Sequence, residues 1–166
     1  MRFRYSFSQL SLLIILILLN SITLAQSKTS TICIRLLQKN IIDKRYVFDN
    51  SKKRTHDETQ LTYLGTLKTN TGKQFKIIRY CWIWGISKRA TNRILVYNQQ
   101  NKYLGNYYLT TTDDLPLKIE HNRLIFKILD DNTSKTVITK ISFDSGIPKS
   151  IYIRGDDLYS FDTGKI

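Results

Sequence analysis

Residues 79–93, RYCWIWGISKRATNR, place both tryptophans of the chain directly before a basic cluster. Three aromatic residues at alternate positions precede three basic ones: Tyr80, Trp82 and Trp84, then Lys88, Arg89 and Arg93. Aromatic rings stack on nucleic-acid bases or on the C–H faces of sugars, while lysine and arginine pair with phosphate, sulfate or carboxylate. The segment therefore predicts a binding face for an anionic or glycan ligand.

Residues 75–86 have the alternation of a β-strand, which would place the three rings on one face. Successive side chains of a strand point to opposite faces, so Phe75, Ile77 and Cys81 share the other face. Both faces are largely apolar, which predicts a central strand with one face in the core. The alternative to an open aromatic face is that the tryptophans themselves form core, since aromatic residues dominate core energetics.

The chain contains two cysteines, Cys33 and Cys81. An oxidising compartment would allow a disulfide between them. That bridge would close a loop of 49 residues and stabilise the fold by about 4 kcal/mol in the chain-entropy model. Two buried free thiols are the alternative. We expect no cysteine nucleophile, because neither of the two histidines accompanies a cysteine in a known local signature.

Two short segments, FDSG at 143–146 and FDTG at 161–164, resemble the Asp-Ser/Thr-Gly signature of aspartic proteases. That chemistry needs two carboxylates that share one proton. In those proteases the two copies lie in separate lobes or subunits, whereas here they are 18 residues apart. We therefore expect simple turns at both segments, and we rank last a hydrolase that would use carboxylates such as Asp144, Asp156 or Asp162.

No other part of the sequence carries a catalytic or cofactor signature. His56 and Glu58, like Glu120 and His121, offer nitrogen and oxygen ligands without the spacing of a zinc site. The chain has no P-loop, no dinucleotide fingerprint and no G-x-S-x-G motif. We expect no metal, no cofactor and no specific nucleic-acid motif, and an action by binding in place of catalysis.

Residues 1–25 have the composition of a secretory signal peptide. Arg2 and Arg4 precede an apolar run at 10–19, and Thr23 and Ala25 occupy the −3 and −1 positions of a cleavage site. The run is shorter than the roughly 18–20 residues that cross a bilayer. We expect export to the periplasm or the extracellular space and no transmembrane segment in the mature chain. An uncleaved membrane anchor is the alternative.

The formal net charge of +13 includes two basic and no acidic residues from positions 1–25, which leaves +11 for residues 26–166. Such an excess favours polyanionic partners. The alternative is that the basic residues, which recur along the whole chain, are simply spread over every face. Two function classes follow: an exported module that binds an anionic or glycan surface, and a protein-interaction or inhibitor module that recognises an acidic protein partner.

Residues 26–166 are predicted to form one all-β domain of about nine or ten strands, arranged as an antiparallel meander, sandwich or small barrel. Turns at 69–72 (TNTG), 98–101 (NQQN) and Asn122 predict hairpins, because asparagine and glycine adopt positive φ. In residues 30–44 the alternation of Ile32, Ile34 and Leu36 favours a strand over a short helix. The YLG triplet at 63–65 and again at 103–105 predicts two similar hairpin strands.

Overall fold

Ten β-strands and one short helix form the described part of this computed structural model, residues 29–129, 135–154 and 157–164. The predicted signal peptide and Asp156 lie outside these residues. The helix covers residues 29–39. The strands are β1 (Arg45–Asp49), β2 (His56–Lys68), β3 (Gln74–Gly85), β4 (Arg89–Asn98), β5 (Tyr103–Leu109), β6 (Lys118–Glu120), β7 (Arg123–Leu129), β8 (Thr136–Ser142), β9 (Ser150–Tyr152) and β10 (Leu158–Asp162).

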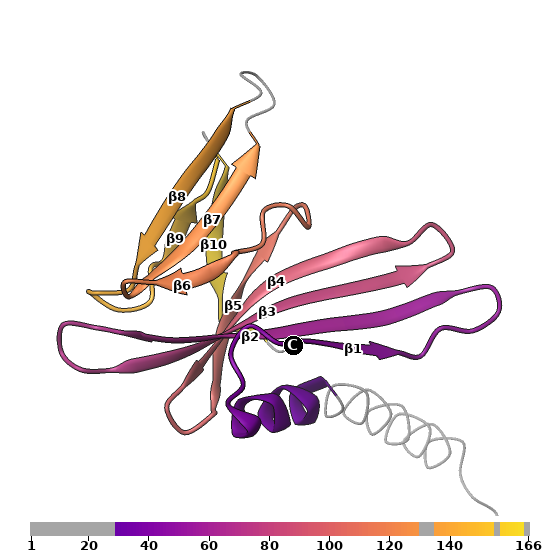
Figure 1. Ribbon diagram of the computed structural model, residues 1–166, viewed down its shortest axis with the longest axis horizontal. Coiled ribbons are helices and arrows are strands. Elements are labelled where there is room, and N and C mark those ends of the chain that lie inside the picture. The colour runs from indigo at the N-terminus through magenta and orange to yellow at the C-terminus, as the bar shows by residue number, and fades with distance from the viewer. Residues whose placement is uncertain (1–28, 130–134, 155–156, 165–166) are drawn as a thin grey trace, which may run out of the picture.

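The strands form two antiparallel sheets, so the predicted all-β class and strand number are confirmed. The large sheet has seven strands in the order β1-β2-β3-β4-β5-β10-β9, and the small sheet has three in the order β6-β7-β8. Strands β1 to β5 are a meander of consecutive hairpins. The chain then leaves the large sheet, builds the small one, and returns as the outermost pair, β9 and β10 (Figure 1).

The main core lies between the two sheets. Ile77, Ile94 and Val96 of the large sheet are fully buried in one cluster with Leu124 and Phe126 of β7. Figure 1 shows the small sheet on one side of the large sheet and the helix on the other. Strand β3 therefore has both of its faces covered over much of its length, as its apolar alternation predicted.

The prediction that residues 30–44 begin as a strand is wrong, because residues 29–39 are helical. Cys33, Leu36 and Leu37 have the i, i+3, i+4 spacing that places side chains on one side of a helix, and all three are buried. They pack in a second cluster against the large sheet, where Leu61 and Tyr97 belong to the same cluster. The alternation of isoleucines that suggested a strand is incidental to this packing.

The three predicted hairpins are confirmed, and their turns use the expected residues. Gly72 has a φ of +82° between β2 and β3, and Asn101 has a φ of +61° between β4 and β5. His121 and Asn122 form the two-residue turn between β6 and β7 with φ values of +48° and +59°, as a type I′ hairpin turn requires. The turn residues, which adopt positive φ, thus determine where consecutive strands are joined as hairpins.

The repeated YLG triplet marks two β-bulges in β2 and β5. The pairing register shifts between Tyr63 and Gly65 and again at the pairing of Val96 with Gly105. Each bulge is followed by a glycine of positive φ, +119° at Gly65 and +152° at Gly105. The repeat therefore belongs to two similar bent strands, as predicted. Within the described residues, no helix is both long and apolar enough to cross a bilayer.

Candidate functional site

The β3–β4 hairpin brings the predicted aromatic and basic residues onto one face of the large sheet. Tyr80 pairs with Arg93, Trp82 with Thr91, and Trp84 with Arg89. Residues directly opposite each other in an antiparallel pair have their side chains on the same face. Because Tyr80 and Trp82 contact the cluster under the helix, this is the face on which the helix lies.

Tyr80 lies at the covered end of this face and is only 6% exposed. It packs with Leu61 and Leu95 beneath the helix. Burial raises the pKa of its hydroxyl to about 12. Tyr80 therefore belongs to the core and does not form part of an exposed surface.

Trp82 and Trp84 lie farther along β3, toward the hairpin turn, and both are partly exposed. Their rings stack with centroids 5.6 Å apart and an interplanar angle of 28°. The Trp82 Nε1–H donates to Asp57 Oδ1 at 2.9 Å, and the Trp84 Nε1–H donates to Thr91 Oγ1 at 3.2 Å. Since stacking and hydrogen bonds fix both indoles, they form a preorganised aromatic platform.

Two arginines of β4 lie over aromatic rings of the same face. The guanidinium carbon of Arg89 is 6.0 Å from the centre of the Trp84 ring, and that of Arg93 is 5.8 Å from the Tyr108 ring. Tyr108 of β5 pairs directly with Arg93 and is 54% exposed. Trp82, Trp84, Arg89, Arg93 and Tyr108 are called the Trp–Arg face below.

The charges of the Trp–Arg face are not neutralised within it. Among the described residues, no carboxylate forms an ion pair with Arg89, Arg93 or Lys88. Lys88 is exposed in the β3–β4 turn, where its φ of +53° helps to close the hairpin. Asp57 is the acidic residue on this face, and its Oδ1 already accepts a hydrogen bond from Trp82. The face therefore presents net positive charge beside a flat aromatic surface.

Sequence reasoning missed Tyr108, which needs the β4–β5 register to be placed beside Arg93. The NQQN turn predicts the hairpin but not its register. Counting outward from the Tyr97–Tyr103 pair would place Tyr107 opposite Arg93, and the bulge at Leu104 shifts the register so that Tyr108 lies there. Lys88, Arg89, Trp82 and Trp84 lie together as their spacing suggested, whereas Tyr80 is separated from them by burial.

The expected disulfide between Cys33 and Cys81 is not formed, and both residues are buried free thiols. The physical reason is their position on opposite faces of the large sheet. Cys33 faces the sheet from the helix, in the cluster that contains Tyr80. Cys81 follows Tyr80 in β3 and so points to the other face. Burial raises the pKa of both thiols, to about 11 for Cys33, which argues against a reactive thiolate at either position.

The FDSG segment at 143–146 forms a turn, as expected, whereas Phe161 and Asp162 of the FDTG segment are the last residues of β10 and only Gly164 lies in a bend. The Gly146 N–H donates to the Phe143 carbonyl at 2.9 Å, and the Gly164 N–H donates to Asp162 Oδ1 at 2.8 Å. Asp144 Oδ1 accepts from Asn122 Nδ2 at 3.2 Å. Asp144 thus ties its turn to the β6–β7 turn, while Asp162 caps the backbone just after β10. Across the residues that the structure describes, no group of three His, Cys, Asp or Glu side chains could hold a metal ion.

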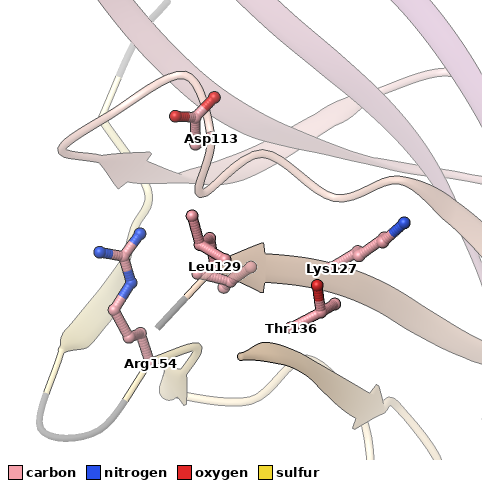
Figure 2. A pocket seen from close by; sticks show the side chains of 6 residues that line it. Asp113, Lys127, Leu129, Thr136 and Arg154 are labelled. Carbon is pink, nitrogen blue, oxygen red and sulfur yellow. The ribbon is translucent and has the colours of Figure 1, made fainter. Parts of the chain in front are cut away.

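A cavity of about 320 Å³ lies away from the Trp–Arg face, beside β7, β8 and the end of β9. Figure 2 shows that its polar side chains come from separate segments and that Lys127 extends away from Arg154. Arg154 already pairs with buried Asp114 at 3.3 Å, and Tyr159 also donates to Asp114 at 3.0 Å. This arginine therefore has a structural role, and the cavity contains none of the predicted site residues.

No family model, curated protein or solved structure matches this chain, so its own geometry alone carries the functional argument.

Proposed function

We propose that the chain is an exported, non-enzymatic module that binds an anionic or glycan surface of the cell envelope or the extracellular space. The observation that carries this proposal is the stacked Trp82–Trp84 pair with Arg89 over its outer ring. An acidic saccharide has both complements, a sugar ring that stacks on the indole and a carboxylate or sulfate that pairs with guanidinium. The net charge of +11 on residues 26–166 adds a long-range attraction for such a ligand.

The test is binding of the purified protein to dextran sulfate, with neutral dextran as the uncharged counterpart. Arg89→Gln is expected to weaken binding about tenfold, because a charge-assisted hydrogen bond contributes roughly 1.5–3 kcal/mol. Trp84→Ala is expected to weaken it at least about fivefold through lost stacking. Lys73→Gln removes the same single charge from the exposed β2–β3 turn and should leave the affinity close to that of the wild type.

The salt dependence of the same titration separates specific recognition from general charge attraction. Binding by the Trp–Arg face should weaken with added salt and should keep its sensitivity to Trp84→Ala at every salt concentration. Equal losses in Arg89→Gln and Lys73→Gln would mean that the charge acts without a site. Binding of neutral dextran as tightly as dextran sulfate would remove the anionic part of the proposal.

A protein-interaction or inhibitor module for an acidic protein partner is the second candidate. Tryptophan, tyrosine and arginine are the residue types enriched at the centres of protein interfaces, and the Trp–Arg face consists of these types alone. This candidate predicts no measurable affinity for dextran sulfate. A null result in the titration would therefore favour an acidic protein over a polyanionic surface.

A further inference from the structure

A second basic site lies on the face of the large sheet opposite the Trp–Arg face. A cavity of about 230 Å³ has residues of β1, β2, β3 and the segment after β5 in its walls, among them Arg45, Thr62, Arg79, Cys81 and Thr112. We call this cavity the Arg pocket. It contains no residue of the Trp–Arg face. It is also separate from the cavity of Figure 2, with which it shares no lining residue.

The strand register explains why two arginines meet in the Arg pocket. Arg45 of β1 pairs with Thr62 of β2, and Thr62 pairs in turn with Arg79 of β3. The three side chains therefore form one row on one face of the sheet. Strands lie about 4.8 Å apart, so the two arginine Cα atoms are separated by about 10 Å. Two arginine side chains at this separation can converge on a single group above Thr62.

The positive charge in this row has no acidic partner. Among the described residues, neither Arg45 nor Arg79 forms an ion pair. Within the described residues, Arg79 donates to neutral oxygens, the Pro116 carbonyl at 3.3 Å and Thr62 Oγ1 at 3.4 Å. Burial lowers the pKa of Arg79, and the charge of Arg45 lowers it further, while Asp43 acts in the opposite direction.

A neutral donor, Thr62, lies beside the two charges. Thr62 is buried, and because its oxygen accepts from Arg79, its own hydrogen is left for another acceptor. Asn92, 1% exposed, lies directly across from Cys81 in the next row and is not among the residues that line the Arg pocket. Its Oδ1 accepts from Thr112 at 3.2 Å, whereas its Nδ2 has no hydrogen-bond partner. Asn92 is therefore linked to the Arg pocket through Thr112, which lines it.

We propose that the Arg pocket binds a phosphate group, held by the guanidinium groups of Arg45 and Arg79 and by the hydroxyl group of Thr62. Guanidinium groups match the geometry of phosphate oxygens in bidentate pairs. The cavity is smaller than the roughly 300–1,000 Å³ of pockets for drug-sized ligands. It therefore takes a free phosphate ion or the phosphate end of a larger molecule, and it is too small for a length of polymer.

The first test is calorimetric titration of the purified protein with inorganic phosphate at constant ionic strength, with sodium chloride as the blank. Arg45→Gln, on the exposed edge strand, should raise the Kd for phosphate at least about tenfold. Arg79→Gln should do the same. Arg123→Gln removes an exposed arginine of β7 and should leave the Kd unchanged. Absence of phosphate binding, or an equal Kd in Arg45→Gln and Arg123→Gln, overturns the proposal.

The second test locates the ion without any substitution, which keeps the proposal testable if Arg79→Gln fails to fold. Cys81 lines the Arg pocket, whereas Cys33 lies under the helix on the other face. Phosphate should slow alkylation of Cys81 and leave the rate at Cys33 unchanged, as measured by peptide mass spectrometry. Phosphate binding that does not slow alkylation of Cys81 places the ion elsewhere and overturns the proposal.

A phosphate monoester identifies the source of the bound group. Glucose 6-phosphate is titrated beside inorganic phosphate against the same variants. Tighter binding of the monoester supports a pocket for the phosphate end of a larger molecule, and tighter binding of the free ion supports a pocket for phosphate itself. Sensitivity of either ligand to Arg45→Gln supports the Arg pocket, and this result is independent of dextran sulfate binding at the Trp–Arg face.

Discussion

Arg89 lies over the ring of Trp84, with its guanidinium carbon 6.0 Å from the ring centre, and the two residues pair directly across β4 and β3. The ring is also fixed by its stacking on Trp82 and by its hydrogen bond to Thr91. A cation and an aromatic surface are thus presented together at the end of a hairpin. A ligand with a flat apolar face and an acidic group would contact both at once.

Removing the negative charge of Asp57 should strengthen polyanion binding. Asp57→Asn keeps an oxygen that can accept from the Trp82 Nε1–H, which lies 2.9 Å from Asp57 Oδ1. We expect the Kd for dextran sulfate to fall by about two- to fivefold, since single charge interactions at surfaces amount to roughly 0.2–1 kcal/mol. Asp113→Asn is the matched control, because it removes one negative charge at an exposed position that lines the cavity of Figure 2, away from the Trp–Arg face. A Kd that stays constant or rises in Asp57→Asn would contradict the assignment of this face.

The positions of the thiols predict that reduction has no effect on stability. Cys33 and Cys81 are free and lie on opposite faces of the large sheet. We expect the midpoint of urea unfolding to be the same with and without dithiothreitol. The denatured protein should react with two equivalents of a thiol reagent. A midpoint that falls on reduction, or a mass lower by two hydrogens in the native protein, would show that the two cysteines are bridged.

Cys33 predicts a loss of stability at alkaline pH. Burial raises the pKa of its thiol from 9.0 to about 11, so the folded protein keeps a proton that the unfolded chain releases. The protonated Cys33 thiol therefore makes its full contribution to the free energy of unfolding below pH 9, and this contribution is lost as the pH rises to about 11. Urea unfolding across this range should show a smaller decline in Cys33→Ala than in the wild type. Parallel pH profiles for the two proteins would refute this role of the thiol.

Gly105 should be the glycine whose substitution costs the most stability. A Cβ at this position would overlap the Asp162 carbonyl oxygen and the Phe161 ring of β10, and its φ is +152°. We expect Gly105→Ala to lower the free energy of unfolding by about 2–4 kcal/mol from overpacking and backbone strain. Gly72→Ala, with a φ of +82° and no atom within 4 Å, isolates the strain and should cost about 1 kcal/mol. Equal losses in the two variants would show that contact with β10 is unimportant.

Local sequence chemistry predicted the strands and turns of this fold, and it failed where tertiary placement decides. Asn101 and Gly72 mark their turns because the backbone there requires positive φ. The helix at 29–39 was missed because Ile32 and Ile34 alternate like a strand, whereas the packing uses Cys33 and Leu37. Strand alternation places Cys81 on the face of β3 opposite Tyr80. It excludes a disulfide with Cys33 only when the helix that carries Cys33 is known to lie on the Tyr80 face.

Part of the candidate site could likewise be predicted from the sequence, and part depends on tertiary packing. The spacing of Trp82 and Trp84 was enough to place both on one face, and the hairpin turn brings Arg89 beside them. The burial of Tyr80 could not be predicted, because it depends on where the helix docks. The Arg pocket was invisible in the sequence, since Arg45 and Arg79 meet only through the registers of three strands.

Ligand binding at the Trp–Arg face is tested most directly by acrylamide quenching of tryptophan fluorescence with and without bound dextran sulfate. Trp82 and Trp84 are the only tryptophans, so the signal reports the Trp–Arg face alone. We predict that the free protein is quenched readily, that saturating dextran sulfate lowers the quenching constant, and that high salt restores it. A quenching constant that is the same in the free and the bound protein would place the ligand elsewhere and contradict the central claim.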